Sequence, residues 1–201
     1  MKRGGLWGFI DASFDQIIEC RFQRAQPFKN GRAAVYENSG GAWVNLAGDW
    51  ITKKRYSVVS SFGEQGVAAA LEGSTLVVVD CDGNEIFRFT GVDGVGGYSG
   101  GLSAIRSARS GKWGYIDGSG SVVIDYKYRL ARRFSGGRAA VEVGMGKEPA
   151  GYINLKGDWI VRFPRTVTLY PFNNGVAVVI GERFRSIFDR SGQEIWRCES
   201  D

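Results

Sequence analysis

The stretch Lys112-Trp113-Gly114-Tyr115-Ile116-Asp117-Gly118-Ser119-Gly120, followed by Val122-Val123-Ile124, decides the fold. It consists of two short runs of aromatic and β-branched residues, which favour strands, on either side of an Asp-x-x-Gly turn. The glycine suits a left-handed position in a hairpin turn, and Asp117 can accept hydrogen bonds from backbone amides two residues on. The stretch therefore predicts a β-hairpin.

The hairpin pattern recurs along the whole chain at spacings of 34 to 37 residues. The residue that closes the first run is Asp or Asn in every copy: Asp11, Asn45, Asp80, Asp117, Asn154 and Asp189. Three residues later, five copies have glycine: Gly48, Gly83, Gly120, Gly157 and Gly192. The first copy has Phe14 at this position. A fixed period of this length indicates stacked or radially arranged units that cover one another.

A second signature alternates with the first, and consists of an aromatic residue, two or three linker residues and a glycine. It occurs at Phe28 to Gly31, Phe62 to Gly66, Tyr98 to Gly101, Phe134 to Gly137 and Phe172 to Gly175. Two positions beyond each glycine the residue is small: Ala33, Ala68, Ser103, Ala139 and Ala177. We expect a neighbouring backbone or a large aromatic ring to approach closely there.

Each unit contains four short candidate strands with short connections, which predicts an all-β fold of tandem antiparallel meanders of about 36 residues. The expected architecture is propeller-like, with about five blades plus an extra N-terminal hairpin, and the alternative is an open β-solenoid or superhelical stack. We expect one domain over residues 1–201, with a half repeat at 1–20. The full repeats are expected at about 21–53, 54–89, 90–125, 126–162 and 163–198.

These columns resemble the WG repeat, also called the KWG repeat, a bacterial β-rich repeat family. The clearest copy is the stretch 112–120 quoted above together with Phe134-Ser135-Gly136-Gly137-Arg138-Ala139-Ala140-Val141. The dipeptide Trp-Gly itself remains only at residues 7–8 and 113–114, so the other copies depend on the glycine and Asp/Asn columns. The resemblance implies a β-repeat scaffold and no established common activity.

The composition excludes several chemistries. The chain has no histidine, so Ser-His-Asp and Cys-His relays and histidine-based zinc sites are impossible. Cys20, Cys81 and Cys198 are odd in number and far apart, which predicts free thiols. The carboxylates of residues 80–85 are explained by the hairpin turn, and we expect no metal, no cofactor and no enzymatic activity. No signal peptide or long apolar run is present, so we expect a cytoplasmic protein without membrane insertion.

The predicted function is a non-enzymatic scaffold for protein–protein interaction. The net charge of +5 comes partly from a basic cluster that suits an acidic protein partner, whereas nucleic acid is not expected because no binding motif accompanies the charge. The candidate partner-binding residues are Arg129, Arg132, Arg133, Arg138, Trp50 and Trp159. The alternatives are a carbohydrate-binding or glycan-processing propeller, and an inhibitor or immunity-type protein that binds an acidic enzyme cleft. The sequence does not predict the oligomeric state.

Overall fold

The computed structural model describes residues 1–144, 149–164 and 167–199. In these ranges the regular elements are all β-strands, and they form six small antiparallel sheets that we number 1 to 6 in chain order. No helix that could cross a membrane is found among the described residues. The predicted all-β class is confirmed.

Sheets 1 and 2 have three strands each, and sheets 3 to 6 have four. The strands of sheets 1 to 3 are β1 (Lys2–Arg3), β2 (Leu6–Ile10), β3 (Gln16–Phe22); β4 (Arg24–Ala25), β5 (Arg32–Glu37), β6 (Gly40–Asn45); and β7 (Val58–Val59), β8 (Ala68–Glu72), β9 (Thr75–Val79), β10 (Glu85–Thr90). The strands of sheets 4 to 6 are β11 (Val92–Val95), β12 (Ser103–Ser107), β13 (Trp113–Ile116), β14 (Val122–Tyr128); β15 (Leu130–Ala131), β16 (Ala139–Glu142), β17 (Ala150–Ile153), β18 (Trp159–Phe163); and β19 (Thr168–Leu169), β20 (Val176–Ile180), β21 (Phe184–Asp189), β22 (Glu194–Glu199). Neighbours in sequence are neighbours in each sheet, so every sheet is a meander.

The Asp/Asn-x-x-Gly column forms the predicted hairpin turns. The side-chain oxygen of Asn45 accepts hydrogen bonds of 2.9 Å from the backbone amides of Ala47 and Asp49, and the other five Asp/Asn residues of the column bond their turns in the same way. The turn glycine is left-handed, with φ of +87° at Gly48. The first copy keeps this conformation without glycine, because Phe14 has φ of +67°.

The second signature forms the turn between the first and second strands of a sheet. In four of the five copies two successive residues have positive φ, for example Gly136 at +58° and Gly137 at +75°. Ser135 and Arg138 bracket this turn and exchange backbone hydrogen bonds of 2.8 and 3.1 Å. Two consecutive left-handed residues define a type I′ turn, which matches the right-handed twist of the flanking strands. The sequence predicted the glycine, whereas the paired turn geometry comes from the structure.

The core lies between successive sheets. At the interface between sheets 4 and 5, Tyr115 and Ile124 of sheet 4 pack against three residues of sheet 5, namely Phe134, Ala139 and Val141. Each of the other four interfaces has a similar cluster that joins neighbouring sheets. Ala139 is 1% exposed, which agrees with the predicted close approach at the small-residue column. Each sheet therefore covers the apolar face of its neighbour.

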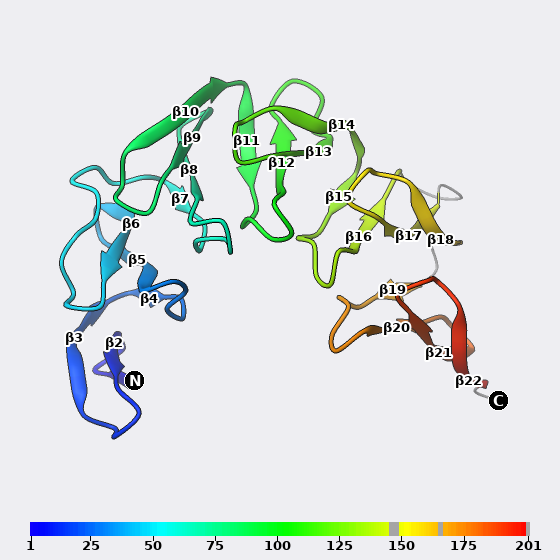
Figure 1. Cartoon of the computed structure of the whole chain (residues 1–201), viewed down its shortest axis with the longest axis horizontal. Helices are drawn as coiled ribbons and strands as arrows, with labels where there is room; N and C mark the ends of the chain where they lie inside the picture. Colours follow the sequence, from blue (N-terminus) through cyan, green and yellow to red (C-terminus); the bar gives the residue numbers. More distant parts are fainter. Residues whose placement is uncertain (145–148, 165–166, 200–201) are drawn as a thin grey trace.

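The six sheets are arranged like propeller blades around an arc (Figure 1). The last strand of each four-stranded sheet and β3 lie on the convex outside, and the type I′ hairpin loops point to the concave side. Sheets 1 and 6 stand at opposite ends of the arc, which does not close on itself. The propeller-like arrangement is confirmed, and the expected extra hairpin is β2–β3, to which the two-residue β1 is added.

Candidate functional site

Two of the six predicted site residues, Arg129 and Arg138, bond other groups of the fold, Arg129 within sheet 5 and Arg138 across to sheet 6. The guanidinium of Arg129 donates to the carboxylate of Glu142 on the adjacent strand of sheet 5. Arg138 lies directly after a type I′ turn, and its Nε donates 2.9 Å to the backbone carbonyl of Arg190 in sheet 6. The equivalent arginine of sheet 2, Arg32, bonds the carbonyl of Cys81 in sheet 3 at 2.7 Å. Arg138 is thus one member of a repeated inter-sheet contact.

The two predicted tryptophans pack at interfaces and are half-buried. Trp50 meets Phe22 of sheet 1 edge to face, with ring centroids 5.9 Å apart, and the guanidinium of Arg55 lies 3.6 Å from its ring centroid. Trp159 meets Tyr128 of sheet 4 in the same way at 6.3 Å, and Arg162 lies 5.0 Å from its ring centroid. In both, a protein group occupies the ring surface that a ligand would stack on.

The remaining predicted residues, Arg132 and Arg133, are exposed. Their backbone is held in place, because the amide of Arg132 donates 3.0 Å to the carbonyl of Ala140 and its carbonyl accepts 2.7 Å from the hydroxyl of Tyr115. Neither guanidinium makes an ion pair within the described parts of the chain, unlike Arg129. The two side chains thus project from a fixed short segment that follows β15.

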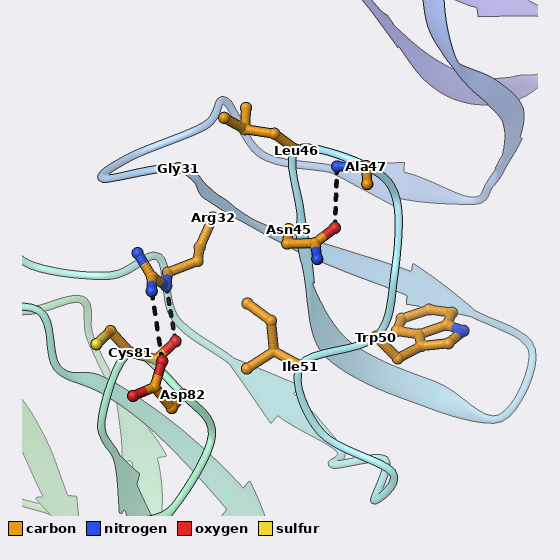
Figure 2. Close-up of a pocket in the computed structure, with 9 residues that line it drawn as sticks. All are labelled: Gly31, Arg32, Asn45, Leu46, Ala47, Trp50, Ile51, Cys81 and Asp82. Carbon is orange, nitrogen blue, oxygen red and sulfur yellow. Dashed lines mark hydrogen bonds and ion pairs between the residues drawn. The ribbon is translucent and has the colours of Figure 1, made fainter.

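A shallow pocket lies between the hairpin turns of sheets 2 and 3 (Figure 2). Arg32 points across it toward Cys81 and Asp82, and its Nη2 lies 3.7 Å from the Asp82 carboxylate. Its Nη1 donates to the carbonyl of Asn30, and the side-chain oxygen of Asn45 is held by its own turn. Because these polar groups bond one another, the pocket is mainly a junction between two sheets.

A larger hollow of about 740 Å³ lies at the C-terminal end of the arc. It is lined by Arg133 and Ser135 from sheet 5 and by residues of sheet 6, namely Tyr170, Pro171, Phe172, Asn173, Asn174, Val176, Val178 and Ile180. Three of these apolar side chains are unusually exposed for a sheet face, with Tyr170 at 46%, Val176 at 36% and Val178 at 37%. The hollow therefore joins a predicted site residue, Arg133, to an apolar surface that the sequence analysis did not single out.

Burial and hydrogen bonds perturb the pKa of groups at the sheet interfaces and turns. Burial raises the pKa of the Tyr115 and Tyr152 phenols far above their usual range. The hydroxyl of Ser119, together with backbone amides of the turn, lowers the pKa of Asp117. These shifts belong to groups that hold the fold, because the phenols donate between sheets and the carboxylate is bound within its turn. The three cysteines are free thiols, as predicted.

Comparison with a family model supports the resemblance of the repeat to the WG repeat. The model described as "WG containing repeat" matches residues 7–40 and 113–147. These two regions match the WG repeat. The matched regions are those in which Trp-Gly remains, at residues 7–8 and 113–114. No curated protein matches the chain.

Solved structures of β-propeller proteins resemble this chain. One is "KlHsv2 with loop 6CD replaced by a Gly-Ser linker", with 12% identity and a TM-score of 0.60 over 98% of this chain and 79% of that chain. A second is Kluyveromyces lactis Hsv2p, with 11% identity and a TM-score of 0.57 over 84% of this chain and 60% of that chain. A third is BamB from Moraxella catarrhalis, with 11% identity and a TM-score of 0.56 over 98% of this chain and 68% of that chain. The likeness shows the fold alone, and this chain spans 60% of the length of Hsv2p.

Proposed function

We propose that this WG-repeat chain is a non-enzymatic scaffold that binds an acidic protein partner through Arg132 and Arg133. The observation that carries the proposal is that these two adjacent, exposed guanidinium groups have no carboxylate partner within the described residues. Other arginines, such as Arg88 and Arg106, are paired with carboxylates at 2.7 Å. The pair therefore remains available to an acidic group from outside the chain.

The fixed backbone favours binding through this pair. Since the amide and carbonyl of Arg132 are both bonded, the segment loses little backbone freedom when a partner binds. Arginines at the rim of an interface mainly raise the association rate and make it sensitive to salt. A scaffold of this kind would bind faster at low ionic strength.

The glycan-binding and glycan-processing alternative depends on residues that also have structural roles in the fold. The turn carboxylates of Asp80, Asp117 and Asp189 accept hydrogen bonds from backbone amides of their own hairpins, so each has a structural role in its turn. Trp50 and Trp159, which motivated glycan binding, are covered by arginines. An inhibitor that binds an acidic enzyme cleft is one form that the proposed scaffold function can take.

The test is capture from a lysate of the organism that encodes the chain, with the immobilised wild type and the double variant Arg132→Glu/Arg133→Glu. The proposal expects at least a tenfold loss of the captured protein. The matched control is Arg109→Glu/Arg183→Glu, which reverses the charge of two other exposed arginines. This variant should capture the same protein as well as the wild type does. Thermal midpoints of both variants should lie within a few degrees of the wild type. Equal capture by both double variants would refute the proposal.

A further inference from the structure

Sheet 6 has one covered face and one open face. Side chains alternate across a strand, and Ala177, Val179 and Phe188 pack against sheet 5. The alternate residues Val176, Val178 and Ile180 of β20 lie on the other side. Register places Ile187 opposite Val178, and Trp196 opposite Ile187. We call these five residues (Val176, Val178, Ile180, Ile187 and Trp196) the open face of sheet 6.

The repeat position of Val178 is buried in sheets 2 to 5, and that of Trp196 is buried in some of the earlier sheets. In the second strand the position of Val178 is held by alanines that are 0–4% exposed: Ala34, Ala69, Ala104 and Ala140. In the fourth strand the position of Trp196 is held in sheets 1 and 4 by Ile18 and Ile124, which are 5% and 2% exposed. Val178 is 37% exposed and Trp196 is 49% exposed. At the position of Val178, the open face therefore corresponds to a surface that the next sheet covers in sheets 2 to 5.

Two substitutions distinguish this face from most of the earlier ones, and the first makes it a poor fit for another sheet of the same kind. Each of the four alanines lies in a cluster with the aromatic residue of the following sheet, as Ala140 does with Phe172. Valine at this position adds two methyl groups where the ring would lie, and overpacking of this kind is destabilising. The third-strand aromatics of three sheets also donate to a carbonyl of the following sheet: Trp43 to Ser60, Tyr115 to Arg132 and Tyr152 to Tyr170. Ile187 has no donor at the equivalent position.

Two free arginines flank the open face. Arg133 lines the hollow beside Val178, and Arg185 lies opposite Ile180 in the register of β20 and β21. Both side chains are exposed, and neither has an ion-pair partner among the described residues. The carboxylate of Asp189, at the far end of the face, is bound within its own turn. Two copies of this face placed together would bring four unpaired arginines close, which disfavours a second copy as the occupant.

We propose that the open face of sheet 6 is a docking surface for an apolar segment of another protein that carries carboxylates at its edges. Apolar side chains of this segment would cover Val178 and Trp196, as the next sheet covers the equivalent residues of earlier sheets. Its carboxylates would pair with Arg133 and Arg185. An apolar centre with a charged rim is the usual organisation of a protein interface. The inference deepens the scaffold function proposed above and rests on it.

The experiment selects random 12-residue peptides displayed on phage against the full chain. We expect enrichment of peptides with several apolar residues and a net negative charge. Dissociation constants of synthesised peptides are then measured by fluorescence anisotropy. Val178→Asp should weaken binding at least tenfold, and Arg133→Glu/Arg185→Glu at least fivefold, with the remaining affinity less sensitive to salt. The matched controls are Leu46→Asp, on a distant turn and 58% exposed, and Arg109→Glu, both within twofold of the wild type.

A second variant distinguishes loss of binding from misfolding of the chain. Trp196→Ala changes the outermost strand of the sheet and should weaken the same peptides at least threefold, with an unchanged thermal midpoint. Peptides that bind Val178→Asp and Trp196→Ala like the wild type, or that lack an acidic bias, would overturn the proposal. A concentration-dependent dimer that Val178→Asp abolishes would overturn it too, because the occupant would be a second copy.

Failure of the docking surface can be distinguished from failure of the proposed scaffold function. If lysate capture is lost in Arg132→Glu/Arg133→Glu but unchanged in Val178→Asp, the scaffold function stands and the docking surface is refuted. If capture is insensitive to both variants while selected peptides still bind the open face, the proposed role of the arginine pair fails and the docking surface stands.

Discussion

The substitution Tyr115→Phe tests the contact between sheets 4 and 5 most sharply. Tyr115 is fully buried, and its hydroxyl donates 2.7 Å to the carbonyl of Arg132 in the following sheet. Phenylalanine keeps the ring that packs against Phe134 and removes only this donor. Loss of one partner of a buried hydrogen bond costs about 1–2 kcal/mol. For a chain of this length that free energy corresponds to a fall of about 2–8 °C in the thermal midpoint.

The matched control is Tyr128→Phe in the same cluster. Tyr128 is 1% exposed, and its hydroxyl makes no hydrogen bond with the described residues. Removal of a buried hydroxyl without a partner should be neutral or slightly stabilising. Urea denaturation followed by circular dichroism gives both free energies of unfolding at a common slope. Equal destabilisation by the two variants would refute the assigned role of the inter-sheet hydrogen bond.

Other substitutions test the turns, the inter-sheet packing and the pH response. Phe14→Gly should stabilise the chain by about 0.5–1 kcal/mol in urea denaturation, because the native φ of +67° is unfavourable for phenylalanine; an unchanged midpoint would contradict this. Gly137→Val should cost about 1–3 kcal/mol at φ of +75°, and Gly137→Asn clearly less, since asparagine tolerates that conformation. Ala104→Val should cost about 1–3 kcal/mol by overpacking against sheet 5, whereas Val178→Ala on the open face should cost under about 1 kcal/mol; similar costs would show that both positions are covered alike. Burial raises the pKa of Tyr128 to about 12, so its protonated phenol contributes stability that is complete below about pH 10 and is lost between pH 10 and 12; Tyr128→Phe should flatten the fall in unfolding free energy over this window.

The local structure was predictable from the sequence because its causes are local. The acceptor of each hairpin turn and the amides that it binds lie within four residues, as at Asn45, so the column can be recognised in one dimension. The left-handed glycines are recognisable for the same reason. The expectation of four strands in each unit is wrong for sheet 2, which has three, because Trp50 joins Val44 only by an isolated bridge. The Trp50 ring instead packs against the guanidinium of Arg55 and the ring of Phe22.

The surface was harder to predict because its residues are paired across long sequence distances. Arg138 and Arg133 are equally basic in the sequence, but Arg138 bonds the carbonyl of Arg190 in the next sheet and Arg133 stays unpaired among the described residues. The open face had a weak signal, namely valine at Val178 where four earlier copies have alanine. That signal is informative only when the structure shows which side of the strand meets the following sheet.

Native-state hydrogen exchange measures the central claim directly, which is that each sheet except the last is covered by its successor. Amides of the third strands β6, β9, β13 and β17 should exchange slowly and to a similar extent, since local opening there would expose two packed faces. Amides of β21, the third strand of sheet 6, should exchange at least tenfold faster, because one face of that sheet is open. Protection of β21 equal to that of β17 in the free, monomeric chain would contradict the account.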